Sequence, residues 1–422
     1  MGRVIVIGGG ASGMMAAGTA ARSGCQVVLL EKNSILGKKL LITGKGRCNL
    51  TNACEIQDVI ERFGEGGKFL YSALHSFPPS ATWNFFAERG LELVVERGRR
   101  VFPASENAAD VVRVLKGYLR EGGVVVRLNS KVEEIVVQGE KIRRAVGVKL
   151  TDGSLLSSDA VILASGGASY PATGSTGDGY IMAEKLGHSL KPLYPALVPL
   201  KTKEEWVKDA AGLSLRNVRA RLFDGDELLG SEFGEMLITH FGVSGPIILT
   251  LSRFVAPRTE QWKTLRLEID LKPALDEERL DARLQRDLRK YARKSLKNAL
   301  TDLLPKTLIP VVIDLCQLLP DRPAHQITRE QRHRLVKVLK GLPLSVVGTL
   351  PLSAAIVTQG GVSLDEVDPR TMASRLVPGL YFAGEVLDLA ADTGGFNLQA
   401  AFATGHAAGR HAALAACAKA LH

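Results

Sequence analysis

Near its amino terminus the chain reads RVIVIGGGASGMMAAGTAARSGCQVVLLEK, residues 3–32. This stretch consists of an apolar strand, a glycine turn, a run of small and apolar residues at helical spacing, and a second apolar strand. In the turn, Gly8 permits a tight bend, Gly10 lets the backbone approach a pyrophosphate, and Gly13 lets helix and strand pack closely. Glu31, at the tip of the second strand, can accept hydrogen bonds from ribose hydroxyls. Because all these parts fall in register, the stretch predicts an α/β dinucleotide-binding fold.

Length and composition limit the class of protein. With 422 residues the chain exceeds the usual size of one domain, so we expect two or three. No run of about 18 apolar residues occurs and the chain begins directly with a strand, so we expect a cytoplasmic protein without a membrane span, membrane partner or secretory signal. The five cysteines are scattered and form no C-x-x-C, which argues against a disulfide framework, a zinc or other metal cluster and a dithiol redox centre.

Later stretches return to the first domain. The strand DAVILASGG, residues 159–167, ends in small residues that let the chain pass close to a ligand. Another strand, near residues 377–382, is followed by Gly384, Glu385 and a long Ala-rich helix. Short strands recur between residues 188 and 271, which indicates an inserted β domain. The expected boundaries are 1–190 and 356–422 for the dinucleotide domain, 191–273 and about 342–355 for the inserted β domain, and 274–341 for a small basic helical domain.

A basic segment covers residues 283–297, where seven basic residues accompany one acidic residue. It therefore carries more than half of the formal net charge of +10. At helical spacing the basic positions gather on one arc and the apolar positions on the opposite one, so we expect a single helix. A charged face is usually only a solvated face, whereas a nearly single-signed one is typical of binding to RNA or another polyanion. Charge alone leaves both interpretations open.

The loop GKKLLITGKGRCNLTN, residues 37–52, is rich in glycine, basic and amide side chains and has no clear period. We interpret it as an ordered loop beside the cofactor. Cys48 is the one cysteine placed where a thiol could act as an acid or nucleophile. The alternative, a small buried residue, stays open.

These motifs together resemble the BaiN/RdsA family of FAD-dependent oxidoreductases. Four stretches occur in the family's order: GGGASG with Glu31 and Lys32, the loop over residues 37–52, DAVILASGG, and YFAGEVLDLAADTGGFNLQAAFATG at residues 381–405. The resemblance implies a Rossmann-like FAD-binding domain split in sequence, an inserted β-barrel-like domain and a small basic helical domain. It implies FAD contacts at Gly8, Gly10, Ala11, Ser12, Gly13, Glu31, Lys32, Lys39, Arg47, Cys48, Val132, Ser165, Gly166, Gly384, Glu385, Asn397 and Leu398.

The resemblance also implies a redox activity. Members of the family are associated with reduction of a uridine in large-subunit ribosomal RNA to dihydrouridine, with reduction of bile-acid-like steroids, and with oxidation of small amines such as aminoacetone. The basic segment favours the first, with ribosomal RNA as partner. The expected RNA contacts are Arg283, Arg286, Lys290, Arg293, Lys294 and Lys297.

Reduction requires a hydride source and a proton donor. No second G-x-G-x-x-G follows, so NADPH or NADH is expected to bind transiently. We expect Cys48 to supply the proton, with Lys45 and Arg47 as further candidates. Two other hypotheses remain: a small-molecule flavin oxidase or reductase acting on an amine or a steroid enone, and a flavin-bearing RNA-binding protein with little catalysis. The oligomeric state stays open.

Overall fold

The computed structural model describes residues 1–258 and 264–419, which fall into two compact units. Unit 1 combines Met1–Tyr194 with Leu352–His422, and unit 2 is Pro195–Pro351. Each unit has its own buried apolar core. No helix among the described residues is long and apolar enough to cross a membrane. The expected boundary between a β domain and a separate helical domain stays a prediction, because both parts lie within unit 2.

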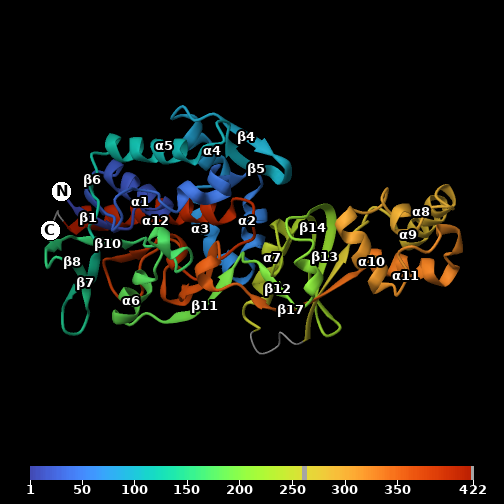
Figure 1. The fold of residues 1–422 in the computed structure, drawn as a ribbon. Coiled ribbons are helices and arrows are strands. Elements are labelled where there is room, and N and C mark those ends of the chain that lie inside the picture. Colours follow the sequence, from blue (N-terminus) through green and yellow to red (C-terminus); the bar gives the residue numbers. More distant parts are fainter. Residues whose placement is uncertain (259–263, 420–422) are drawn as a thin grey trace. The chain divides into compact units, whose positions relative to one another are not determined.

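A five-stranded parallel sheet forms the centre of unit 1 (Figure 1). Its strands are β1 (Arg3–Ile7), β2 (Gln26–Leu30), β6 (Val125–Arg127), β10 (Ala160–Leu163) and β19 (Leu380–Phe382), in the order β19-β10-β1-β2-β6. The central strands β1 and β10 are almost wholly buried, as their unbroken apolar sequences require in a sheet covered on both faces. From β1 the strand order runs to β2 and β6 on one side, and the chain then crosses to β10 and β19 on the other side. Such sheets bind ligands at the carboxyl ends of the strands where the order changes side, here β1 and β10.

Two helices that are far apart in the sequence pack against each other beside this sheet. They are α1 (Ala11–Arg22), which follows β1, and α12 (Phe396–Lys419). A Cβ atom at Gly405 would lie 2.4 Å from the carbonyl oxygen of Ser12, and one at Gly409 would lie 2.3 Å from that of Ala16. Glycine at these positions therefore lets the two backbones touch. The return of the chain's end to its first domain is confirmed.

Further elements complete unit 1. The remaining helices are α2 (Ile56–Arg62), α3 (Tyr71–Ser76), α4 (Pro79–Ala87), α5 (Ala108–Glu121) and α6 (Asp178–Lys185). The remaining strands are β3 (Thr51–Asn52), β4 (Leu93–Glu96), β5 (Arg100–Pro103), β7 (Val132–Gln138), β8 (Arg144–Leu150), β9 (Leu155–Ser157), β11 (Leu190–Ala196) and β18 (Val357–Val362). They form the sheets β3-β5-β4, β7-β8-β9 and β11-β18.

Unit 2 contains a closed barrel, which confirms the predicted β-barrel-like insert. Its strands are β12 (Leu200–Thr202), β13 (Ser214–Asp224), β14 (Glu227–Thr239), β15 (Gly242–Ser244), β16 (Leu265–Asp270) and β17 (Leu342–Thr349), in the order β12-β15-β14-β13-β16-β17. Closure follows from the pairing of β12 with β17. Burial along β17 alternates strictly, because successive side chains of a strand point to opposite faces. The helix α7 (Pro246–Val255) packs against β14.

Four helices join β16 to β17: α8 (Glu277–Lys290), α9 (Leu296–Ala299), α10 (Ile309–Leu315) and α11 (Arg329–Lys340). Their apolar side chains and those of the barrel form one continuous core. An ion pair ties α8 to α11, with the carboxylate of Asp281 accepting from Arg332 at 2.5 and 3.1 Å.

The prediction of a single helix carrying all seven basic residues is wrong. The helix α8 ends at Lys290, and a turn follows before α9. Contacts with a distant segment hold that turn, because the carbonyl of Lys294 accepts from the Ala324 amide at 2.9 Å and Ser295 forms a bridge with Pro323.

Candidate functional site

The glycine turn between β1 and α1 has the geometry that its spacing predicts. Gly8 has a φ of +104°, and a Cβ there would lie 2.5 Å from the carbonyl oxygen of Ala164. A Cβ at Gly13 would lie 1.8 Å from the Gly8 carbonyl oxygen, so strand and helix meet here. At Gly10, by contrast, a Cβ would meet no atom within 4 Å. Open space therefore lies where the backbone is expected to approach a phosphate.

The amino terminus of α1 has no side-chain cap. Its first residues, Ala11 and Ser12, are expected FAD contacts. The first amides of a helix lack intrahelical partners and carry the positive end of the helix dipole, so they attract an anion. The expected pyrophosphate position agrees with this arrangement.

The carboxylate of Glu31 lies at the end of β2 and is 7% exposed. Its Oε2 atom accepts from the Gly9 amide at 2.7 Å, and Oε1 accepts from the Asn33 amide at 2.8 Å and from the Asn33 side chain at 2.7 Å. A carboxylate offers about four acceptor positions, so one is left for a ribose hydroxyl. Val132, an expected FAD contact, is buried at the start of β7, where the Ser130 amide donates to the Glu31 carbonyl.

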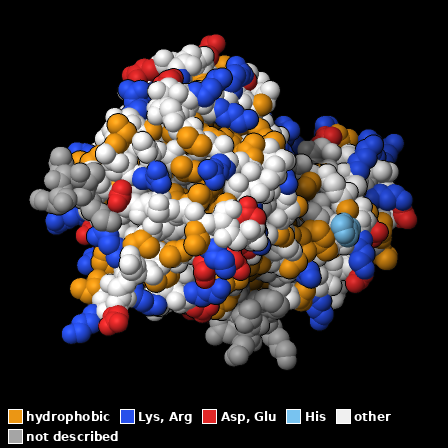
Figure 2. Space-filling model, turned by 90° about the vertical axis from the view of Figure 1, so that its left-hand side faces the viewer, with side chains coloured by type: hydrophobic (Ala, Val, Ile, Leu, Met, Phe, Trp, Pro, Cys, Tyr) orange, Lys and Arg blue, Asp and Glu red, His pale blue; other side chains and the backbone are white. Residues whose placement is uncertain are grey.

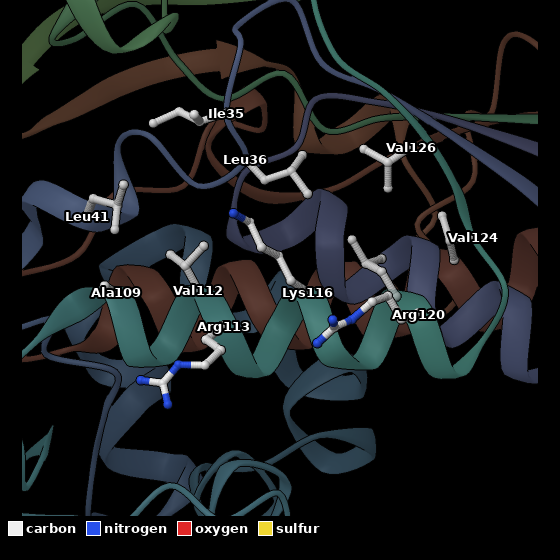
Figure 3. A pocket seen from close by; sticks show the side chains of 11 residues that line it. Ile35, Leu36, Leu41, Ala109, Val112, Arg113, Lys116, Arg120, Val124 and Val126 are labelled. Atoms are coloured by element: carbon white, nitrogen blue, oxygen red, sulfur yellow. The ribbon is translucent and has the colours of Figure 1, made fainter.

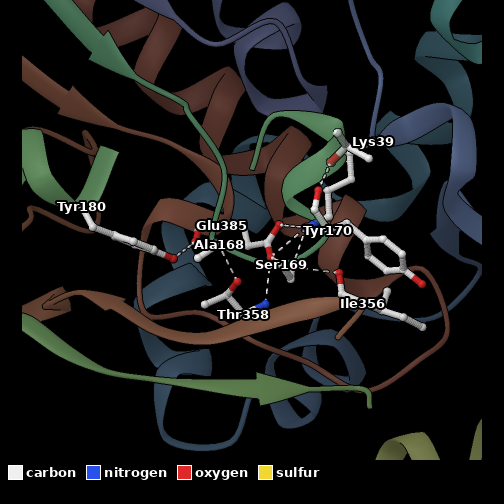
Figure 4. Close-up of polar contacts among 9 residues, drawn as sticks. Lys39, Ala168, Ser169, Tyr170, Tyr180, Ile356, Thr358 and Glu385 are labelled. Carbon is white, nitrogen blue, oxygen red and sulfur yellow. Dashed lines mark hydrogen bonds and ion pairs between the residues drawn. The ribbon is translucent and has the colours of Figure 1, made fainter. Parts of the chain in front are cut away.

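A polar cluster joins the ends of β10 and β19 to the loop that follows β2 (Figure 4). Lys39 Nζ lies 2.9 Å from Glu385 Oε2 and donates to Ser169 Oγ at 2.8 Å. Glu385 Oε1 accepts from Ser169 Oγ at 3.1 Å and from the Thr358 amide at 2.8 Å. Tyr180 donates to the Glu385 backbone carbonyl at 3.2 Å. The cluster places two predicted cofactor contacts, Lys39 and Glu385, against each other.

The second predicted lysine contact is also paired. Lys32 donates to Thr176 Oγ1 at 2.5 Å and to Asp178 Oδ2 at 2.7 Å. Burial alone would raise the pKa of Asp178, but the hydrogen bonds from Lys32 and Thr176 outweigh it and lower that pKa. Lys32 therefore joins the end of β2 to the start of α6.

The small residues beyond β10 and β19 bring the chain close to α1. Gly384 has a φ of +77°, and a Cβ there would lie 2.4 Å from Ser12 Oγ. Gly166 also has a positive φ, of +76°. Ser165 Oγ is buried and has no hydrogen-bond partner in the described part of the chain. These predicted contacts therefore gather at the carboxyl edge of the sheet.

The loop over residues 43–48 separates the three candidate proton donors. Lys45 is exposed, has a φ of +59°, and has no ion-pair partner among the described residues. Arg47 pairs with Glu96 and, at 2.9 Å, with Glu106, and its guanidinium carbon lies 4.3 Å from the centre of the Phe102 ring. Arg47 is therefore already held by protein groups.

Cys48 belongs to the buried core and is fully inaccessible. Burial raises the pKa of its thiol to about 12, and a hydrogen bond with Thr43 offsets only part of the effect. The thiol thus stays protonated and out of solvent. Of the two interpretations left open by the sequence, this favours the small buried residue over a nucleophile.

The start of α12 is fixed by side chains. Asn397 Oδ1 accepts from the Ala391 amide at 2.9 Å, and Asn397 Nδ2 donates to the Ala391 carbonyl at 3.0 Å, so the preceding loop is closed. Leu398, the next predicted contact, is partly buried. Asn397 acts on the backbone of its own loop here.

Sequence reasoning missed Gln399. It is fully buried, and its Oε1 accepts from the hydroxyls of Thr51 and Thr82, both at 2.7 Å, while its Nε2 donates to the Phe77 carbonyl at 2.8 Å. It ties α12 to three segments of the first half of the chain. The available signal was a glutamine between two apolar residues, Leu398 and Ala400.

The residues present fit a bound FAD. The space at Gly10 suits a pyrophosphate, and the small residues leave room for close approach of a ligand. Two buried acceptors, Ser165 Oγ and Asn49 Oδ1, have no protein partner among the described residues. Buried polar atoms are nearly always satisfied, so these atoms indicate a ligand position. No group of acidic, histidine or cysteine side chains in the described chain suits a metal ion.

A separate apolar groove of about 610 Å³ lies between α5 and the loop after β2 (Figure 3). Leu36, Val112 and Val126 line it, with Lys116 at its border. None of the predicted site residues contributes to it. Its lining comes from three segments, which is why the sequence did not indicate it.

The seven basic residues of the segment 283–297 fall into two sets. Arg283, Lys290 and Lys297 are paired with Asp287, Asp302 and Asp321, at 2.7, 3.0 and 2.7 Å. The other set is exposed and has no ion-pair partner in the described residues: Arg286, Arg289, Arg293 and Lys294. Basic side chains also occur all over the face displayed in Figure 2, so positive charge is not confined to this segment.

Comparison with known proteins places the chain in a family. The model of the HI0933-like protein Rossmann domain matches residues 2–411. A 3-dehydro-bile acid delta(4,6)-reductase of Clostridium scindens is 37% identical over 415 residues, which covers 98% of this chain and 99% of the relative. A ribosomal RNA dihydrouridine synthase of Escherichia coli is 31% identical over 413 residues, which covers 95% of each chain.

A solved structure shares the fold. The 3-ketosteroid delta1-dehydrogenase from Sterolibacterium denitrificans aligns with a TM-score of 0.52 and 14% sequence identity, and the alignment covers 98% of this chain and 100% of that one. At this identity the likeness concerns the fold alone.

Proposed function

Because this chain belongs to the HI0933-like family and is a FAD-dependent oxidoreductase, we propose that it reduces a uridine of large-subunit ribosomal RNA to dihydrouridine, using NADPH or NADH. The observation that supports this substrate is the set of exposed, unpaired basic side chains in unit 2. The Escherichia coli relative carries the name of that activity.

The unpaired set suits a phosphate backbone. Arg286, Arg289, Arg293 and Lys294 lie within nine consecutive residues, and each exposed cation can displace a counterion from RNA. Lys294 Nζ also lies 4.4 Å from the centre of the Tyr291 ring, which limits the positions of its amine. Lys290 and Lys297 already have carboxylate partners, so we assign them a smaller share of any RNA contact.

A bound FAD would supply hydride transfer from a nicotinamide to a carbon of the substrate. The chain's own residues hold the cofactor at the glycine turn and at Glu31. The ion pair between Lys39 and Glu385 fixes the loop beside it. Lys45 is the exposed, unpaired candidate among the three proposed proton donors, so we propose it for protonation of the substrate.

The test is mass spectrometry of ribosomal RNA from cells with and without this protein. A uridine heavier by two hydrogen atoms is expected only in cells that contain the protein. The triple variant Arg286→Glu, Arg289→Glu, Arg293→Glu should abolish the modification. A control with the same change of charge, Arg113→Glu, Lys116→Glu, Arg120→Glu on α5, should retain it. Identical RNA in both strains would refute the proposal.

Sequence identity favours a second candidate function, reduction of a steroid enone. The bile acid reductase is 37% identical to this chain, whereas the Escherichia coli relative is 31% identical. Both relatives' names describe reduction, so one flavin site can serve either substrate class. Oxidation of NADPH or NADH in the presence of a 3-oxo bile acid with conjugated double bonds would test it. Turnover that is insensitive to salt and to the triple Arg→Glu variant would favour the steroid, since its recognition needs no phosphate contacts. We propose no amine oxidation.

A further inference from the structure

Two cysteines that are distant in sequence lie side by side in unit 1. The Sγ atoms of Cys25 and Cys417 are 3.2 Å apart, although 392 positions separate the residues. Cys25 lies in the turn between α1 and β2, and Cys417 in the last turns of α12. A Cβ at Gly2 would lie 2.5 Å from the carbonyl carbon of Ala416, so the start of the chain packs against the same turn.

We propose that Cys25 and Cys417 form a disulfide when the protein meets a hydroperoxide. A disulfide needs an S–S distance of about 2 Å, so the sulfur atoms must approach by about 1 Å. Rotation of the Cys417 side chain can supply much of this movement, because that side chain is only partly buried. In the described part of the chain, no other two sulfur atoms lie within hydrogen-bonding distance.

The two thiols differ in burial, and this difference assigns their roles in the oxidation. Cys25 is 7% exposed, and its Sγ donates to the Ala413 carbonyl at 3.5 Å. Burial and, as a smaller cause, the neighbouring Cys417 raise the pKa of the Cys25 thiol to about 12. Cys25 thus stays a protonated thiol, and the more exposed Cys417 meets the oxidant first.

One molecule of hydrogen peroxide is enough to oxidise the two thiols to a disulfide. The thiolate of Cys417 attacks one oxygen of hydrogen peroxide, the O–O bond breaks, and the leaving hydroxide takes up a proton to become water. The sulfur of Cys25 then attacks the sulfur of the resulting sulfenic acid, the S–O bond breaks, and the leaving hydroxide takes the Cys25 proton to become a second water molecule. Two electrons pass from the two thiols to the peroxide.

The product would join the ends of the FAD-binding unit. The same helix α12 already touches α1 through Gly405 and Gly409. A bond at Cys417 would secure its far end to the chain entering β2. A disulfide that closes so long a loop restricts the unfolded chain strongly, so it should raise the melting temperature.

The experiment treats the FAD-loaded protein with a small excess of hydrogen peroxide, blocks free thiols with N-ethylmaleimide and digests with trypsin. A joined pair of peptides, residues 23–32 with 411–419, is expected and should disappear on reduction with dithiothreitol. Cys25→Ser and Cys417→Ser should each abolish it, whereas the control Cys54→Ser should retain it. The melting temperature should rise on oxidation only in chains with both cysteines.

Two results would overturn the proposal. One is a Cys417 that reaches the sulfinic acid while Cys25 is still alkylated as a free thiol. The other is a disulfide that joins either cysteine to Cys48, Cys54 or Cys316 instead.

Discussion

Replacing Gly10 by alanine is expected to weaken FAD binding while leaving the fold of the apo protein intact. A Cβ at this position meets no protein atom within 4 Å, and the backbone has a φ of −82° and a ψ of −167°, which any residue adopts. Gly10 is the N-cap of α1, where alanine is a poorer cap than glycine. We therefore expect the free energy of unfolding of the apo protein to change by less than about 1 kcal/mol.

The effect on FAD follows from what fills the open space. A methyl group at Gly10 would occupy the position expected for the pyrophosphate and move it away from the first amides of α1. Each hydrogen bond to a charged group contributes about 1.5–3 kcal/mol. Loss of one of them predicts a loss of about 1.5–3 kcal/mol of binding free energy, which is a dissociation constant roughly 10- to 150-fold larger.

Titration of the apo protein with FAD, followed by flavin fluorescence, measures the affinity, and urea denaturation measures the stability. Gly117→Ala is the matched control, because a Cβ at Gly117, within α5, also meets no atom within 4 Å. It should leave FAD affinity unchanged and stabilise the helix by about 0.5–1 kcal/mol. Wild-type affinity in Gly10→Ala would show that the methyl group does not displace the pyrophosphate, and an unfolded apo protein would show that the fold does not accommodate it.

Further predictions concern packing, polar burial, protonation and chemistry. Gly405→Val should destabilise unit 1 by about 1–3 kcal/mol in urea denaturation, because its Cβ would lie 2.4 Å from the Ser12 carbonyl oxygen. Gln399→Leu should cost about 3 kcal/mol or more in the same assay, since it leaves buried hydrogen-bond partners unsatisfied. Burial lowers the pKa of His188, so the contribution of its neutral ring to stability should be fully present above the unfolded-state pKa of about 6.5 and be lost as the pH falls below it. In His188→Gln the urea midpoint should fall less over the same pH range. Lys45→Met should slow uridine reduction about 100-fold at unchanged FAD affinity, and an unchanged initial rate would remove Lys45 as the proton donor.

The parts of the fold that depend on local patterns could be predicted from the sequence. Gly8, Gly10 and Gly13 have roles set by residues within one turn, so their spacing indicated strand, turn and helix. The asparagine cap of α5 was predictable for the same reason: Asn107 accepts from the Ala109 amide at 2.9 Å.

The side-chain positions in the loop over residues 43–48 could not be predicted from the local sequence. Arg47 and Cys48 are neighbours, yet one lies between two carboxylates and the other lies in the core. Positive φ angles at Lys45 and Cys48 turn the chain sharply, so adjacent side chains diverge. The positions of β4, which carries Glu96, and of the turn after β5, which carries Glu106, decide which residue finds a partner.

The prediction of a single helix over the basic segment was wrong for a related reason. Its spacing is helical throughout, and no proline or glycine marks an end at Lys290. The turn forms because residues near 323 bind its backbone, a contact that helix periodicity does not contain. The paired carboxylates Asp302 and Asp321 also lie outside the basic segment, so the sequence overstated its free charge.

The contact between α1 and α12 has a consequence for how the protein is made. A ribosome synthesises α1 early, but the helix that receives it through Gly405 and Gly409 emerges only after all of unit 2. The inserted unit can therefore fold while the surrounding unit is still incomplete, which reverses the usual N-terminal-first order. Until translation reaches α12, the nascent chain exposes the surface of α1, so this surface is open to chaperones throughout the synthesis of unit 2, and cofactor loading belongs to the last stage of biosynthesis.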